Sequence, residues 1–301
     1  MPRQAPWIGI GTSGSWTEPD EALYYGGLDY EVEQVDAYDD LGNKVPGILV
    51  NRSRTGAIMG VTSNQYGIVQ NRDAFSLLDP FCKAGGVIEH AGMTASGMAF
   101  MVMRMPGMAF GFAGDGFELF VCAMNSFNGK YPLALIITPI RVICQNMFRQ
   151  LMGRGDTALL IKHGRFAADR IISASKASSL LLDYQHDFVD ALGEADKEVR
   201  ADWEVERFAE KLLPLTPETS EHPRAKFTNE RVLEARREFI DEYYHAPDNY
   251  RYEGTRLGVL NAYYDWLTHR EPTRRTSGYN EARFGRLLSG EAVDSKLILS
   301  A

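Results

Sequence analysis

Two apolar runs separated by an asparagine–glycine pair constrain this chain more than any other feature of its sequence. Residues 117–124 are rich in β-branched and aromatic side chains, residues 133–138 are equally apolar, and Asn128-Gly129 lies between them. An Asn-Gly pair between two such runs is typical of a β-hairpin, because both residues adopt the positive φ angles that a tight hairpin turn requires. The sequence therefore predicts an antiparallel hairpin in the middle of the chain.

A helix is predicted directly after this hairpin, over residues 139–152. Thr138 would be its N-cap, and Pro139 would occupy the first helical position, where proline is tolerated. Apolar side chains recur at helical spacing and are expected to be buried: Ile140, Ile143, Cys144, Met147, Phe148 and Leu151. The opposite face has no acid and carries Arg141, Gln145, Asn146, Arg149 and Gln150. Two interpretations remain open, a core helix with a solvated side and a helix whose polar face contacts an anionic partner.

Strand patterns dominate before this helix and helical patterns dominate after it. Strands are expected at residues 30–35, 45–51, 57–62, 87–91, 98–104 and 109–112, with one helix opening at Asn71 or Arg72 and ending before Gly85. Later helices are expected at residues 167–192, stopped by Gly193, at 196–213, and after N-caps at Thr228 and Thr255. Because strands and helices do not alternate, the fold class is predicted to be α+β. An N-terminal antiparallel β-sheet would pack on the central helix and be followed by a mainly helical C-terminal region.

The chain divides on this basis into three parts. Residues 1–15 are rich in Gly, Ser and Pro and are expected to form a flexible arm or a strand added to a sheet edge. Residues 16–160 would form the β-rich core with the hairpin–helix unit, and residues 161–301 the helical region.

Composition indicates a soluble protein of the cytoplasm. Of the 301 residues, 45% are hydrophobic and 24% charged, and no apolar run is long enough to span a membrane. The first 16 residues lack the apolar core of a signal peptide. The three cysteines, Cys82, Cys122 and Cys144, stand in apolar surroundings and are interpreted as buried thiols.

Charge is distributed unevenly along the chain, whose formal net charge is −8. Residues 141–176 carry seven basic and two acidic side chains, whereas residues 194–221 carry nine acidic and four basic ones. These blocks could be ordinary helix surface. They could also meet across a head-to-tail interface, and on that basis a homo-oligomer is predicted.

Two motifs resemble those of a known family. Tyr66, Val69, Gln70 and Asn71 form one, and a second runs from Arg141-Val142 through Cys144 to Asn146. With the surrounding residues they resemble an uncharacterised family of bacteriophage and plasmid genomes, the phage/plasmid-like proteins, from about Trp16 to the C-terminus. The chain departs from that pattern at Lys162-His163-Gly164, where Arg-His-Thr is more common, and at Ser126-Phe127, where Ser-His is common. The resemblance implies a phage or mobile-element context and supplies no activity.

No known catalytic motif is present, so no catalytic, cofactor-binding or metal-binding residue is assigned. Gly9, Gly11 and Gly14 match the letters of the dinucleotide fingerprint, but no strand of sufficient length precedes them. None of the six histidines stands three or four residues from another histidine or a cysteine. An enzyme whose site is assembled from distant residues remains one alternative.

The function expected from these patterns is non-catalytic binding of single-stranded DNA, with a role in annealing or recombination. The order of the expected elements, strands followed by a helix, is similar to that of the single-strand annealing proteins. This is an analogy at the level of fold. The expected contacts are basic and amide side chains: Arg141, Gln145, Asn146, Arg149, Lys162, Arg165, Arg52 and Arg54. Tyr66 and Phe127 are candidate aromatic rings for stacking on bases. The second alternative is a protein that binds or inhibits a host protein; no membrane partner is expected.

Overall fold

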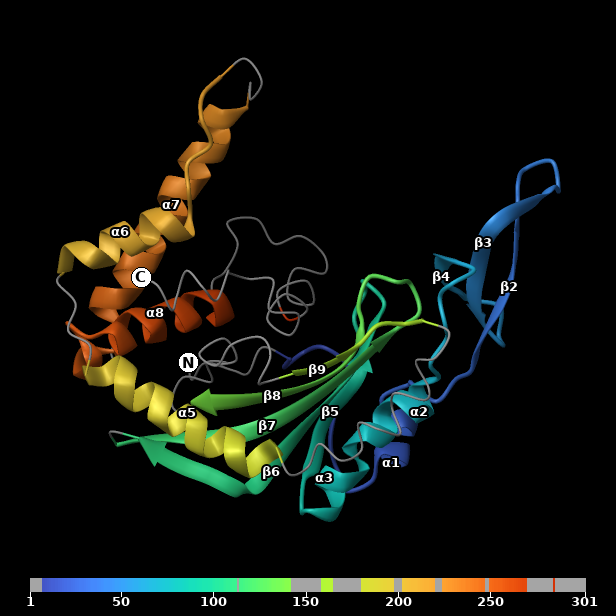
Figure 1. Ribbon diagram of the computed structural model, residues 1–301, viewed down its shortest axis with the longest axis horizontal. Helices are drawn as coiled ribbons and strands as arrows, with labels where there is room; N and C mark the ends of the chain where they lie inside the picture. Colours follow the sequence, from blue (N-terminus) through green and yellow to red (C-terminus); the bar gives the residue numbers. More distant parts are fainter. Residues whose placement is uncertain are drawn as a thin grey trace.

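The computed structural model places an antiparallel sheet at the centre of an α+β fold, as predicted. It describes residues 7–112, 114–141, 158–164, 180–197, 202–219, 224–246 and 249–269, together with Phe284. Residues 12–161 contain both sheets, and helices dominate the described residues after them (Figure 1).

The large sheet has six strands in the order β1-β5-β6-β7-β8-β9, and every neighbouring pair is antiparallel. The strands are β1 (Thr12–Trp16), β5 (Val87–Met93), β6 (Met98–Phe112), β7 (Asp115–Ser126), β8 (Leu133–Arg141) and β9 (Ala158–Ile161). The hairpin predicted around Asn128-Gly129 is β7–β8, and Gly129 adopts a φ of 73° in its turn. The sequence pattern therefore identified this pair of neighbouring strands correctly.

Both faces of the large sheet are buried. Val102, Cys122 and Ile136 are paired across three strands and point to one side, where Trp7, Ile10 and Phe284 cover them. Their neighbours in each strand point to the other side, onto α1–α3 and the helical region; among them are Met101, Ala123 and Leu135. This explains why β6–β8 are almost continuously apolar instead of alternating with polar residues.

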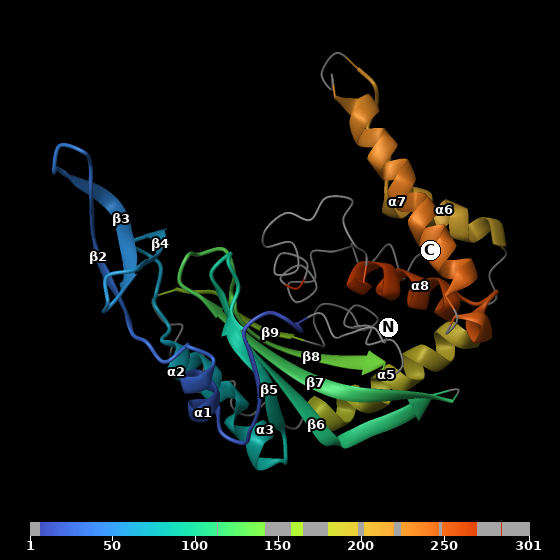
Figure 2. The same cartoon turned by 180° about the vertical axis from the view of Figure 1, so that it is seen from behind.

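The small sheet forms an arm that projects from the body of the molecule (Figures 1 and 2). It consists of β2 (Val32–Tyr38), β3 (Lys44–Ser53) and β4 (Ile58–Ser63), close to the three predicted strands. The turn at its tip is organised by Asp39, whose Oδ1 accepts hydrogen bonds from the backbone N–H groups of Leu41 at 3.0 Å and Asn43 at 2.7 Å. Among the described residues, the arm contacts the body of the molecule at its base.

Three short helices lie against the large sheet beside β5. They are α1 (Pro19–Tyr25), α2 (Asn71–Phe75) and α3 (Asp79–Lys83), with the 3₁₀ turn η1 (Ser76–Leu78) between the last two. The single helix predicted from Asn71 to Cys82 is therefore divided, and α3 begins just before Pro80, a residue that lacks the N–H of a helix interior.

The helical region contains α5 (Leu180–Lys197), α6 (Asp202–Leu212), α7 (Ala225–His245), η3 (Tyr250–Tyr252) and α8 (Arg256–His269). Thr255 caps α8 as predicted, because its hydroxyl accepts a 3.2 Å hydrogen bond from the Gly258 N–H. The Tyr252 hydroxyl donates to the buried carboxylate of Asp115, at the start of β7. This bond joins the helical region to the large sheet. In the described part of the chain, no helix is long and apolar enough to cross a membrane.

Three predicted boundaries were wrong. Thr138 and Pro139 do not start a helix, since β8 continues to Arg141, which pairs with Phe117. The stop expected at Gly193 is wrong, because α5 continues to Lys197. Thr228 is not an N-cap; it lies inside α7, and its hydroxyl donates back to the Arg224 carbonyl.

The remainder of the predicted central helix, residues 142–152, lies outside the described residues. The same holds for its expected core side chains Ile143, Cys144, Met147, Phe148 and Leu151. The N-terminal segment contributes β1 to the edge of the sheet, and Trp7 and Ile10 pack on the sheet.

Candidate nucleic-acid interface

Three segments that are distant in sequence meet at the end of the large sheet where β7 turns into β8. They are Tyr66 in the loop before α2, the turn 126–131, and residues 162–164 after β9; we call this surface the junction. The Tyr66 hydroxyl donates a 2.7 Å hydrogen bond to the Ser126 carbonyl. Its ring stacks on His163, with centroids 4.9 Å apart and planes at 23°. Tyr66 therefore holds the turn and the end of β9 together.

Buried side-chain amides support the junction from inside. Asn125 in β7 donates 3.0 Å hydrogen bonds to the Val69 carbonyl and to Asn71 Oδ1, and Asn71 donates to the Leu28 carbonyl at 3.0 Å. Gln70 binds both backbone groups of Val32, accepting from its N–H at 3.0 Å and donating to its carbonyl at 2.8 Å. The Val-Gln-Asn part of the sequence motif is thus structural, because its amides satisfy backbone groups that burial would otherwise leave unpaired.

The base of the arm is tied to the same junction. Asn51 in β3 is buried and donates a 2.6 Å hydrogen bond to the Phe127 carbonyl. Gln34 in β2 donates to the Tyr66 carbonyl at 3.2 Å. Gly60 in β4 lies so close to the turn that a Cβ added there would be 2.5 Å from the Asn128 Cα. The arm and the β7–β8 turn are consequently in direct contact.

The stacked pair at the junction is uncharged near neutral pH. Burial raises the pKa of Tyr66 to about 12, against the opposing effect of its hydrogen bond to Ser126. Burial lowers the pKa of His163 to about 4, and the nearby Gly67 backbone offsets only part of that shift. No described residue makes a hydrogen bond of ordinary geometry to either ring nitrogen of His163. The pair is therefore uncharged, and both of its residues are half-buried.

Positive charge at the junction comes from two lysines in its own segments. Lys130 follows Gly129, whose added Cβ would lie 4.0 Å from the Tyr66 ring, and Lys162 precedes His163. Both lysines are exposed, and neither makes an ion pair with a described residue. Lys162 was predicted as a contact. Lys130 was missed, although its place after an Asn-Gly turn could have drawn attention to it.

The other predicted contacts do not form one track with Lys162. Arg141 ends β8 opposite Phe117, whereas Lys162 follows Ile161, which pairs with Leu133 at the start of β8. At about 3.4 Å per residue, the length of β8 separates them by roughly 27 Å. The predicted helical row through Arg141 is wrong, because Arg141 belongs to a strand. Gln145, Asn146, Arg149 and Arg165 lie outside the described residues.

The two arginines predicted at the arm are already paired. Arg52 makes a 2.9 Å ion pair with Glu33 across the β2–β3 ladder, and Arg54 pairs with Glu31. Exposed pairs of this kind are weak, so they could exchange partners at little cost. Phe127 does not offer a ring for stacking, because only 1% of its surface is exposed.

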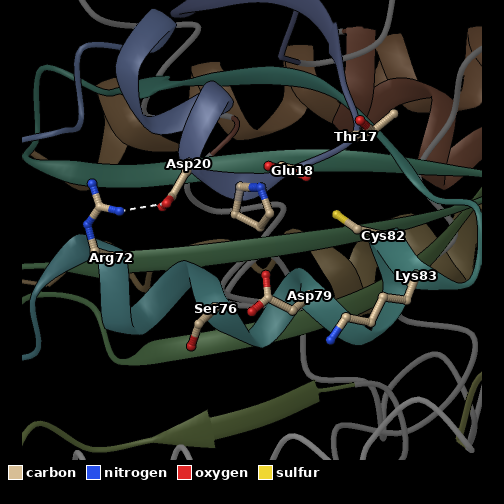
Figure 3. A pocket seen from close by; sticks show the side chains of 9 residues that line it. Thr17, Glu18, Asp20, Arg72, Ser76, Asp79, Cys82 and Lys83 are labelled. Carbon is tan, nitrogen blue, oxygen red and sulfur yellow. Dashed lines mark hydrogen bonds and ion pairs between the residues drawn. The ribbon is translucent and has the colours of Figure 1, made fainter.

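Away from the junction, a pocket of about 500 Å³ lies between α1 and the α2–α3 segment (Figure 3). Arg72 crosses its mouth and binds Asp20 at 2.6 Å and Asp29 at 3.2 Å. Burial raises the pKa of Asp79, and burial together with Asp79 and Glu18 raises the pKa of the Cys82 thiol to about 11. A thiol so protonated is a poor nucleophile. Among the described residues, no three His, Cys, Asp or Glu side chains are arranged to hold a metal ion.

Fold and junction together define an α+β protein with a β-hairpin arm, a helical region and a small basic, aromatic surface between them. The chain belongs to the family described as domain of unknown function DUF932, whose model matches residues 58–288. No curated protein and no solved structure matches the chain significantly.

Proposed function

We propose that this protein binds single-stranded DNA without catalysing a reaction, in the DNA metabolism of a bacteriophage or plasmid. The observation that carries the proposal is that Lys130 and Lys162, which are exposed and make no ion pair with a described residue, belong to the same junction as the stacked rings of Tyr66 and His163. Lysines bind phosphates, and neutral aromatic rings stack on bases of any sequence. An annealing or recombination role would follow if the bound strand is presented for pairing.

Single-stranded DNA suits this surface better than duplex DNA does. A net charge of −8 opposes broad contact with the dense phosphates of a duplex. The aromatic surface beside the lysines can be used only by bases that are free to unstack. Two phosphate contacts for each chain predict a shallow salt dependence, with log K falling by roughly 1.4 for each tenfold rise in salt.

The test is fluorescence anisotropy with a labelled oligothymidine at 20 and 200 mM salt. We expect the wild type to bind at low salt, and Lys130→Ala/Lys162→Ala to bind at least tenfold more weakly with a flatter salt dependence. Lys83→Ala/Lys211→Ala is the matched control, because it removes two exposed lysines at α3 and α6 and changes the net charge equally.

Two results would contradict the proposal. One is the absence of wild-type binding at low salt, and the other is equal weakening by both double variants. The first result would leave binding to a host protein as the better-supported alternative. The second would indicate that only total charge matters and that the junction has no special role.

A further inference from the structure

The arm exposes an apolar face that no described residue covers. Asn51, Gly60 and Thr62 point from one face of the arm toward the β7–β8 turn. The opposite face carries five aliphatic side chains, Val35, Ile48, Val50, Ile58 and Val61, and the register places the exposed Arg52–Glu33 ion pair beside Ile58 on the same face. Ile58 is 72% exposed and Val61 is 58% exposed. A sheet face of this kind on a projecting element is typical of an interaction surface.

A second exposed surface, with two apolar side chains about 120° apart around the helix axis, lies on the outer part of α7, which projects at the opposite side of the molecule (Figures 1 and 2). Phe227 is 67% exposed there, and Leu233 is 38% exposed. The two surfaces are too far apart to meet within one chain, as both views show.

The two surfaces have opposite charge. The arm, residues 31–63, carries five acidic and three basic side chains, a net charge of −2. Its bases are all engaged inside the arm, in ion pairs of Lys44 with Asp36, Arg52 with Glu33 and Arg54 with Glu31. The outer part of α7, residues 224–237, carries five basic and two acidic side chains, a net charge of +3. Four of those bases are exposed and make no ion pair with a described residue: Arg224, Lys226, Arg231 and Arg237.

We infer that the arm of one copy docks on the outer part of α7 of a second copy. Apolar side chains would meet apolar side chains, and the acidic arm would meet the basic helix. Two arms would not associate face to face as readily, because both are acidic. Since the two surfaces differ and lie at opposite sides of the chain, the contact is head-to-tail, and its repetition gives a ring or a filament.

The first measurement is the mass of the nuclease-treated full-length protein by light scattering, over a range of concentrations. We expect assemblies of several chains, and the mass of these assemblies should decrease as the salt concentration rises. Ile58→Asp/Val61→Asp should disable the arm, and Phe227→Asp/Leu233→Asp should disable α7, each giving the mass of a single chain. Tyr24→Asp is the matched control, because it changes an aromatic residue that is 70% exposed on α1, and it should leave the mass unchanged.

Mixing the two disabled proteins is decisive. The arm variant keeps a working α7 and the α7 variant keeps a working arm, so an equal mixture should give a dimer and nothing larger. A wild type of single-chain mass at high concentration would overturn the inference. So would an α7 variant that still assembles alone, because that result would indicate pairing between arms.

A pair of charge-reversing substitutions distinguishes loss of the contact from misfolding. Arg231→Glu/Arg237→Glu changes only exposed side chains and should raise the concentration needed for assembly at least tenfold at low salt, with an unchanged circular dichroism spectrum. No change in that concentration would overturn the role assigned to charge on α7, and with it the choice of this helix as the docking surface.

Discussion

Asn125 in β7 donates a 3.0 Å hydrogen bond from its side-chain amide to Asn71 Oδ1 at the start of α2. The same amide reaches the Val69 carbonyl, so one side chain in the sheet fixes the segment that carries Tyr66. The junction is therefore built on a buried polar contact between elements 54 residues apart.

Replacing Asn125 with Ala should lower the free energy of unfolding by roughly 2–4 kcal/mol, because two buried acceptors lose their donor. Urea denaturation followed by circular dichroism measures this change. Gln65→Ala, an exposed amide in the same region, should change stability by less than about 0.5 kcal/mol. Equal small effects of both substitutions would show that the Asn125 contacts are not important for stability.

The arm should loosen at its base when Gln70 is changed. Gln70→Ala removes both hydrogen bonds to Val32, whereas Gln70→Glu keeps an acceptor for the Val32 N–H and loses the donor to its carbonyl. Hydrogen exchange in β2 should therefore accelerate most in the alanine variant and less in the glutamate variant. Unchanged exchange in both variants would mean that Asn51 and Gln34 alone hold the arm.

Because of His163, the free energy of unfolding should decrease more steeply as the pH falls than it would without this side chain. Burial lowers the pKa of its folded state to about 4, against 6.5 in the unfolded chain. Between these values the unfolded chain binds a proton that the folded chain does not, so stability is complete above pH 6.5 and is lost as the pH falls toward 4. The wild type should lose roughly 1–2 kcal/mol more than His163→Asn between pH 7 and pH 5.

Gln65→Ala is the control for this titration, because it changes an exposed side chain near Tyr66 that carries no titratable group. Its pH dependence should match that of the wild type. If His163→Asn and the wild type instead lose stability in parallel, His163 must already be accessible to protons in the folded protein.

The link between the sheet and the helical region depends on Tyr252. Tyr252→Phe removes the hydroxyl that donates to the buried Asp115 and should cost roughly 1–3 kcal/mol, because the carboxylate loses a charge-assisted bond. Limited proteolysis should then cut within residues 224–269 faster than in the wild type. Tyr250→Phe, on an exposed ring two residues earlier, should leave the rate of cleavage unchanged.

The sequence predicted most strands well, because the residue pattern that indicates a strand lies within a few consecutive positions. Asn128-Gly129 specified a turn, and the runs beside it could be little other than strands. Thr138-Pro139 was misread because a Thr-Pro pair suits a helix start and also a strand end. β9 pairs with β8 only as far as Ile136. At Pro139, β8 therefore has a described neighbouring strand on one side only, and the missing N–H of Pro139 is tolerated there.

The junction could not be predicted, because it depends on contacts between segments far apart in sequence. Tyr66 and His163 are 97 positions apart, and nothing in either segment indicates that the rings stack. Arg52 and Arg54 were predicted as contacts because a sequence shows charge but does not show the glutamates that neutralise it across the ladder.

The arm acts mechanically as a lever. β3 has 10 residues, so its tip lies about 30 Å from the anchored base. A rotation of about 10° at the base would move the tip by about 5 Å, given that strand length. The Asp39 turn keeps the tip rigid, so the motion would be transmitted along the ribbon instead of being absorbed at its end. A small strain at Asn51 or Gly60 thus becomes a large displacement at the far end of the molecule.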